Sequence, residues 1–168
     1  MTTRFKTLLS VKSSLISLYL ALTIPIPFIS SEQLKTASLL TFFLGCFLII
    51  NITSDYVETC NKKIIYKTGF LSRFFGKKNW EILWADIKSI KSFPTSQGSK
   101  VYYIITCKNE NFLLPQRIEN FEKFLSIISK KTGLVLEGLS YISPLWTYKL
   151  LTVISLIMIF AEVIAFSI

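Results

Sequence analysis

The sequence contains no histidine, and this absence removes much of the commonest chemistry of enzyme active sites. Histidine is the usual general base near neutral pH, the partner of catalytic serine and cysteine, and the commonest ligand of transition metals. The ten acidic residues are scattered, without a pair spaced for acid–base catalysis, and no nucleotide-binding glycine motif is present. We therefore expect a non-enzymatic protein with no cofactor, no metal and no small-molecule substrate.

Cysteine and charge are also scarce. Three cysteines in 168 residues are too few, and odd in number, for a disulfide scaffold. Charged residues make up 17% of the chain, whereas a soluble domain has about 25%. Because 51% of the residues are hydrophobic, the chain is equally unlike a disordered protein. This composition indicates a membrane protein.

Two segments without any charged residue lie near the N-terminus, at residues 13–31 and 36–54, each 19 residues long. A third apolar segment, residues 147–168, carries one charge, Glu162, after its first turn. A helix of 19 residues is roughly 28 Å long, which is about the thickness of the hydrocarbon core of a bilayer. The sequence therefore predicts three transmembrane helices.

Two features of the first span need an interpretation. Pro25 and Pro27 lie near its end, so we expect the helix to end or kink there. Its basic flank and apolar run also resemble a signal peptide, but the sequence has no Ala-x-Ala-type cleavage site and a second span follows directly. We therefore expect a retained helix, joined to the second span in a tight N-terminal hairpin within residues 1–54.

The distribution of lysine and arginine predicts the orientation. Arg4, Lys6 and Lys12 precede the first span, and residues 55–146 contain 14 basic against 8 acidic residues. The positive-inside rule places both segments on the cytoplasmic or stromal side of a bacterial inner membrane or thylakoid membrane, and the C-terminus on the far side. This bias also accounts for the net charge of +9 without a nucleic-acid partner.

The third span has two further features. Trp146, Tyr148 and Lys149 stand at its start and predict an interfacial anchor. Glu162 is an acid within a span, which is a functional candidate in any membrane protein. We expect Glu162 either to reach the far interface or to pair with a partner subunit.

Residues 55–146 predict a small α+β domain between the second and third spans. Apolar residues recur at spacings of three and four from Ile118 to Ile128, which predicts an amphipathic helix that ends at Gly133. Expected strands precede it at 55–59, 63–68, 79–84, 87–93, 101–107 and 111–114. One set of apolar residues is expected to form the common core: Trp84, Ile87, Ile90, Tyr103, Ile105, Phe121, Leu125 and Ile128.

A basic and aromatic segment within this domain is the candidate contact site. Three interpretations stay open: contact with anionic lipid, docking of a protein partner, or ordinary core aromatics between solvated lysines. The candidate residues are Phe70, Arg73, Phe74, Phe75, Lys77, Lys78 and Trp80.

The order of three segments in this domain resembles bacterial pleckstrin-homology-like (PH-like) membrane proteins. The similarity covers roughly residues 55–134 and is carried by Asn61–Gly69, Phe70–Lys78 and Trp84–Ile90. The resemblance implies a strongly bent antiparallel sheet that one C-terminal helix caps. The expected fold class is thus membrane α+β, with three transmembrane helices and a PH-like domain.

A narrower set of residues is similar to the plastid and cyanobacterial photosystem I assembly factor family. Gly76–Asn79, Asp86–Ile90 and Leu136–Leu139 carry this similarity, whereas the third span and Trp80-Glu81 depart from it. The resemblance implies a scaffold or assembly factor that binds membrane lipids and a membrane protein complex, with a photosystem as the specific expectation. A lipid-sensing or membrane-stress module and a small permanent subunit of a complex are the alternatives.

Overall fold

The computed structural model describes residues 2–96, 98–136 and 138–167. Ile168, the expected end of the third span, and Glu137, within one stretch of the narrower resemblance, lie outside the described residues.

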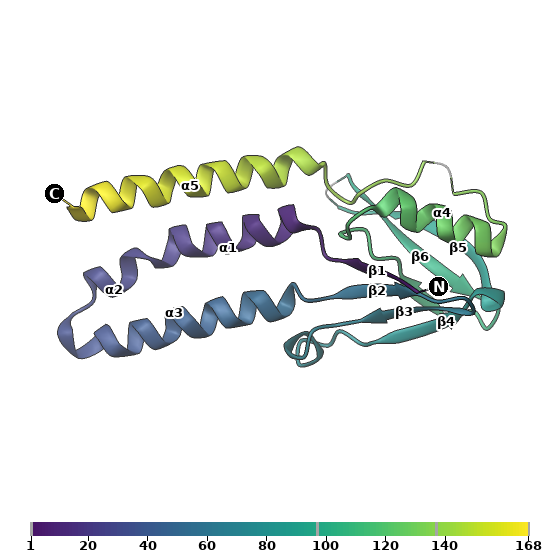
Figure 1. The fold of residues 1–168 in the computed structure, drawn as a ribbon, viewed down its shortest axis with the longest axis horizontal. Coiled ribbons are helices and arrows are strands. Elements are labelled where there is room, and N and C mark those ends of the chain that lie inside the picture. The colour runs from purple at the N-terminus through teal and green to yellow at the C-terminus, as the bar shows by residue number, and fades with distance from the viewer. Residues whose placement is uncertain (1, 97, 137, 168) are drawn as a thin grey trace. The chain divides into compact units, whose positions relative to one another are not determined.

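The helices and strands form two units that interleave along the sequence (Figure 1). The helical unit consists of residues 9–53 and 145–168. The sheet unit consists of residues 1–8 and 54–144. The sheet unit therefore differs from the expected range of 55–146, because it includes residues from before the first span.

The helical unit contains the three long helices that the sequence predicts. Each is long and apolar enough to cross a membrane: Leu9–Ile29, Glu32–Ile52 and Leu145–Ser167. The first begins four residues earlier than expected and includes Lys12, because backbone hydrogen bonds rather than the nearest charge set the end of a helix. A lysine near the end of a span can extend its ammonium group toward the interface.

The prolines divide the first of these helices, as expected. Helix α1 (Leu9–Thr23) ends two residues before Pro25, and α2 (Pro25–Ile29) begins on it. Proline is suited to the first helical position because the missing N–H has no partner there. The other two are α3 (Glu32–Ile52) and α5 (Leu145–Ser167).

Small residues allow the helices of this unit to approach one another. Ser14 and Ser17 on α1 and Ser155 on α5 are buried, and each hydroxyl donates a hydrogen bond to a carbonyl of its own helix. These bonds satisfy the hydroxyl groups in an apolar environment. On α3, a Cβ at Gly45 would overlap the ring of Tyr19, whose hydroxyl donates to the Phe42 carbonyl at 2.9 Å.

The first sheet of the sheet unit has four antiparallel strands. They pair in the order of the chain: β1 (Thr3–Lys6), β2 (Tyr56–Thr59), β3 (Lys63–Lys67) and β4 (Trp80–Leu83). The strand β1 was not predicted from the sequence, because its basic residues were interpreted only as a flank of the first span. Phe5 is 3% exposed and lies opposite Val57 of β2, so burial of one side chain fixes this short strand.

The second sheet has three antiparallel strands, β5 (Ile87–Pro94), β6 (Lys100–Thr106) and β7 (Asn111–Leu113), in that order. The single helix α4 (Phe121–Thr132) follows them, as predicted. Gly133 ends α4 with φ of 73°, a left-handed conformation that glycine adopts without steric cost. The structure thus has two antiparallel sheets and a closing helix in this unit (Figure 1).

The core of the sheet unit corrects one part of the prediction. Trp84, Ile87, Phe121, Leu125 and Ile128 are buried together, and Ile90 packs against them half-buried. On β6, however, the buried apolar side chains are Tyr102 and Ile104, and the expected Tyr103 and Ile105 are only half-buried. Because β6 is apolar on both faces, its alternation could not identify the inner face.

Candidate functional site

The candidate site is built on the loop from Gly69 to Asn79, which joins β3 to β4 and is called the phenylalanine loop below. A single 3-10 turn, η1 (Leu71–Arg73), begins the loop, and the Lys77 N–H donates to the Ser72 carbonyl at 3.1 Å. Gly76, which lies between Ser72 and Lys77 in the chain, has φ of 80°, in the left-handed region that strongly favours glycine. Local hydrogen bonds therefore give the loop a defined shape.

Three phenylalanines of the loop are exposed to solvent. Phe70, Phe74 and Phe75 are 68%, 77% and 70% exposed, and the rings of Phe70 and Phe74 meet edge to face at 5.7 Å. The interpretation of the segment as core aromatics therefore does not hold for these three residues. Apolar rings gathered on one exposed loop are typical of a contact surface for a membrane or a protein.

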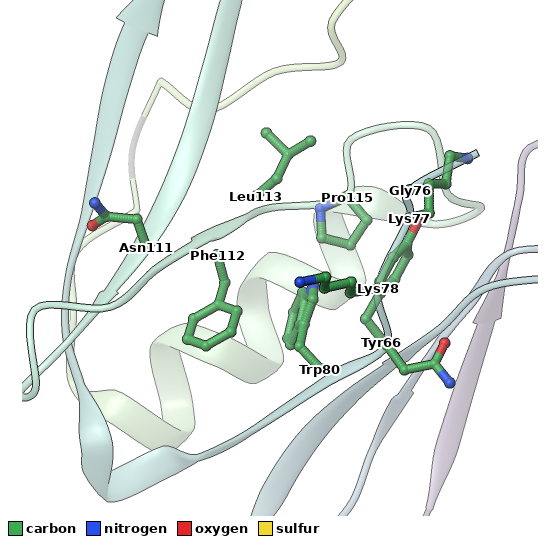
Figure 2. A pocket seen from close by; sticks show the side chains of 10 residues that line it. Tyr66, Gly76, Lys77, Lys78, Trp80, Asn111, Phe112, Leu113 and Pro115 are labelled. Carbon is green, nitrogen blue, oxygen red and sulfur yellow. The ribbon is translucent and has the colours of Figure 1, made fainter. Parts of the chain in front are cut away.

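Trp80 differs from the other aromatic residues of the predicted set. It lies half-buried on β4 and stacks on Tyr66 at 5.5 Å between ring centroids. Its other neighbour is Phe112 of β7, also at 5.5 Å (Figure 2). Trp80 thus belongs to a half-buried aromatic cluster with Tyr66 and Phe112, and not to the exposed rings of the loop.

Asp55 fixes the phenylalanine loop, and the sequence analysis did not single it out. Its carboxylate accepts hydrogen bonds from the Tyr66 hydroxyl at 2.9 Å, the Gly69 N–H at 3.0 Å and the Ser72 hydroxyl at 3.4 Å. The Lys77 ammonium also donates to it, at 2.6 Å. The Asp55 side chain is 12% exposed. Its hydrogen bonds to Tyr66, Gly69 and Ser72 are part-buried, whereas its contact with Lys77 is exposed. Hydrogen bonds to an ionised carboxylate are stronger than those between neutral groups.

The contacts of Asp55 change the electrostatics of the site. Burial, with a smaller contribution from the negative charge of Asp55, raises the pKa of Tyr66 above its ordinary value, so its hydroxyl remains protonated and donates. Lys77 is neutralised by its ion pair with Asp55. Arg73 and Lys78 have no carboxylate within 4.0 Å among the residues that the structure describes. Two of the three predicted cations thus stay available for a partner.

The predicted anchor and intramembrane acid belong to α5 of the helical unit, whereas the loop belongs to the sheet unit. Trp146 and Lys149 are exposed in the first turns of α5, and Tyr148 is half-buried. Glu162 is half-buried near the C-terminal end, and none of the described residues hydrogen-bonds its buried Oε2 atom. Their roles as anchor and as interfacial or paired acid stay predictions.

Metal-ligating residues do not converge in the described part of the chain. Among residues 2–96, 98–136 and 138–167, no three His, Cys, Asp or Glu side chains are grouped so that they could hold a metal ion. The arrangement around the phenylalanine loop offers apolar contact and positive charge instead.

Comparison with known proteins gives the chain a relative. No protein-family model matches it. A cyanobacterial protein from Synechocystis sp., named "Uncharacterized protein slr0269", is 30% identical over 148 residues. The aligned residues make up 84% of this chain and 74% of the Synechocystis protein. The similarity therefore covers most of both proteins, and the chain belongs to the family of this Synechocystis protein.

Proposed function

We propose that the chain is a non-enzymatic integral membrane scaffold or assembly factor whose sheet unit is PH-like and binds a membrane protein complex. The observation that carries the proposal is the group of Phe70, Phe74 and Phe75, exposed on a loop that Asp55 holds in place. A photosystem is the specific partner we propose. Its support is the resemblance to the assembly factor family and the cyanobacterial origin of the relative.

The topology of the sheet unit supports the PH-like part of the proposal. Within the sheet unit, four antiparallel strands, then three, then one helix follow in order along the chain, with α1, α2 and α3 of the helical unit inserted between β1 and β2. The 3-10 turn η2 (Trp84–Asp86) connects the two sheets, at the segment that carries the most specific part of the resemblance. This is the order that a bent sheet with one capping helix requires.

The pairing of β1 with β2 supports a location of the N-terminal segment and the sheet unit on the same side of the membrane. Two spans separate Lys6 from Tyr56, and these residues are partners in the sheet, so the N-terminus and the unit share a side. The basic residues of this shared segment favour the cytoplasmic or stromal side. Three spans then leave the C-terminus on the far side.

Covalent connection keeps the phenylalanine loop near the membrane surface. Asp55 follows Ile52, the last residue of α3, after only two residues. Three residues of extended chain reach no more than about 11 Å, whatever the orientation of the unit. Because Asp55 binds both ends of the loop, at Gly69 and Lys77, the exposed rings stay close to the interface.

The expected free energies favour the exposed phenylalanine rings over the basic side chains as the main source of binding. Full burial of one phenylalanine side chain contributes about 1.5–3 kcal/mol. A cation near an anionic surface contributes about 1 kcal/mol, and salt screens it. Because Lys77 is paired to Asp55, the free charge of the predicted set comes from Arg73 and Lys78. We therefore expect aromatic substitutions to weaken partner binding more than charge substitutions.

Comparison of two double variants in the full-length protein tests the proposal. Phe74→Ala/Phe75→Ala should reduce recovery of the partner complex after mild detergent extraction at least about tenfold, and Arg73→Ala/Lys78→Ala should reduce it less. Phe93→Ala is the matched control, because Phe93 is 48% exposed on β5, away from the loop. Unchanged recovery with the aromatic variant would exclude the phenylalanine loop as the docking site.

Lipid sensing is the second candidate function, favoured by the available charges of Arg73 and Lys78 on the same loop as the exposed rings. A fluorophore on Phe75→Cys in full-length protein whose three native cysteines are replaced by alanine, reconstituted in nanodiscs, separates the two functions. If the loop senses lipid, its emission shifts to the blue when phosphatidylglycerol replaces phosphatidylcholine, and Arg73→Ala/Lys78→Ala removes the shift. A partner recovered at fixed stoichiometry would instead indicate a permanent subunit.

A further inference from the structure

The two sheets of the sheet unit leave a pocket between their edge strands. In the sheets as described, β4 pairs only with β3, and β7 pairs only with β6. A cavity of about 490 Å³ lies between β4 and β7, within the size range of small-molecule sites. Figure 2 shows its lining residues: Tyr66, Gly76, Lys77, Lys78, Asn79, Trp80, Asn111, Phe112, Leu113 and Pro115.

The walls of this pocket are apolar and preformed. Trp80 stacks on Tyr66 and lies tilted at 46° against Phe112, with ring centroids 5.5 Å apart in each pair. The only polar atom of the Tyr66 side chain is engaged by Asp55 at 2.9 Å, so its ring contributes apolar surface to the wall. Pro115 lies near Trp80 in Figure 2, whereas the side chain of Leu113, which also lines the pocket, extends from β7 in the opposite direction to Phe112. The pocket therefore suits a hydrocarbon chain.

One end of the pocket carries positive charge. Lys77 and Lys78 both line it, and the ion pair with Asp55 neutralises Lys77. Lys78 lies beside Trp80 in Figure 2, and no carboxylate within the described part of the chain lies within 4.0 Å of its ammonium group. The described lining thus combines an apolar wall with a free cation at its rim and includes no acidic residue.

We propose that this pocket binds a hydrocarbon chain with an acidic head group, with the chain along Trp80 and Phe112 and the head at Lys78. Such a molecule has two sources, a free fatty acid or an acidic membrane lipid. The site is separate from the exposed rings of Phe70, Phe74 and Phe75, none of which lines it. The inference therefore does not depend on the proposed function.

Trp80 provides a reporter inside the pocket, because brominated chains quench tryptophan fluorescence on contact. The chain has three tryptophans. Trp84 is buried and serves as an unquenched reference, and Trp146→Phe removes the third. Full-length Trp146→Phe protein in phosphatidylcholine nanodiscs is titrated with 9,10-dibromostearate, with its methyl ester as the uncharged probe. A second set of nanodiscs contains phosphatidylglycerol with brominated chains.

Two leucines of similar exposure provide matched variants. Leu113 is 51% exposed and lines the pocket, whereas Leu83 is 48% exposed and does not. Leu113→Asp adds a negative charge to the lining of the pocket and should abolish saturable quenching, while Leu83→Asp should leave it unchanged. Lys78→Gln should weaken binding of the acid about fivefold and leave the methyl ester unaffected.

The pattern of quenching decides between the sources and tests the inference. Saturable quenching by dibromostearate that Leu113→Asp abolishes identifies a free fatty acid. Quenching only by brominated phosphatidylglycerol, again lost in Leu113→Asp, identifies a membrane lipid. Quenching that is absent, unsaturable, or equal in the Leu113→Asp and Leu83→Asp proteins would overturn the proposal. Phe74→Ala/Phe75→Ala should leave the quenching intact, which separates a failure of this inference from a failure of the scaffold proposal.

Discussion

At the scale of single residues, Asp55 shows what the sequence could and could not reveal about the site. Phe70, Phe74 and Phe75 could be identified from the sequence as candidate contact residues, because aromatic and basic residues cluster in this segment. Asp55 could not, because its four donors lie 11 to 22 positions further along the chain. No local pattern records such contacts, so the pairing that neutralises Lys77 emerges only from the fold.

Removal of the Asp55 charge should loosen the phenylalanine loop. We expect Asp55→Asn to cost about 1–3 kcal/mol, because it weakens three part-buried hydrogen bonds to a charged group and one exposed ion pair at once. Hydrogen exchange of amides 69–79 in the full-length protein measures the effect. Glu81→Gln is the control, since the ion pair of Glu81 with Lys63 is exposed and such pairs contribute at most about 1 kcal/mol. Equal exchange in the two variants would refute the anchoring role.

The raised pKa of Tyr66 predicts a dependence of stability on alkaline pH. Up to about pH 9 the hydroxyl is protonated in both the folded and the unfolded chain, so it adds no slope. Above the ordinary pKa of 10.0 the unfolded chain releases this proton and the folded chain keeps it. Stability should therefore fall as pH rises beyond 10. Thermal unfolding of Tyr66→Phe should show a smaller decline over this range than the wild-type protein, and an identical decline would contradict this assignment.

At the scale of elements, the strands from β2 to β7 were predicted to within one residue of their observed bounds at each end, and β1 was missed. The strands β3 and β5 were predicted close to their observed bounds, because their ends coincide with turn residues. The strand β1 was missed because its partner strand β2 lies beyond two spans, and because the ring that packs on Phe5 belongs to α4, which is also remote in sequence. The inner face of β6 was predicted wrongly because apolar residues occupy both of its faces.

The contribution of β1 can be measured through Phe5. Its ring is buried and meets the ring of Phe124 of α4 at 5.4 Å. Phe5→Ala should therefore destabilise the sheet unit by about 3–5 kcal/mol. Arg4→Ala, on the same strand, removes an exposed contact to Tyr56 and Glu58 and should cost less than about 1 kcal/mol. Pulse proteolysis of the full-length variants compares the two, and equal losses would show that β1 is not fixed by its buried ring.

At the scale of the whole molecule, the sheet unit is assembled from chain segments on both sides of the first two spans. A fragment of residues 55–146 lacks β1, whose four residues all pair with β2. The edge of β2 and the neighbours of Phe5 would then be exposed to solvent. Experiments on function therefore belong on the full-length protein in a membrane.

The predicted orientation can be tested with single thiols. In a variant with Cys46→Ala and Cys60→Ala, the exposed Cys107 of the sheet unit is the remaining thiol. A membrane-impermeant maleimide should label it in inside-out vesicles only. Ser31→Cys, combined with Cys107→Ala in the same background, places the thiol between α2 and α3 and should be labelled in right-side-out vesicles only. The reverse pattern would place the sheet unit on the exterior.

The central claim is that the phenylalanine loop docks a membrane protein complex, and photo-crosslinking at position 74 in native membranes tests it most directly. Benzoylphenylalanine replaces Phe74, which is 77% exposed, and in a control protein it replaces Phe93. The account predicts a discrete protein adduct from position 74, absent from position 93 and lost when Asp55→Asn releases the loop. Adducts from position 74 that contain only lipid, or that match those from position 93, would contradict it.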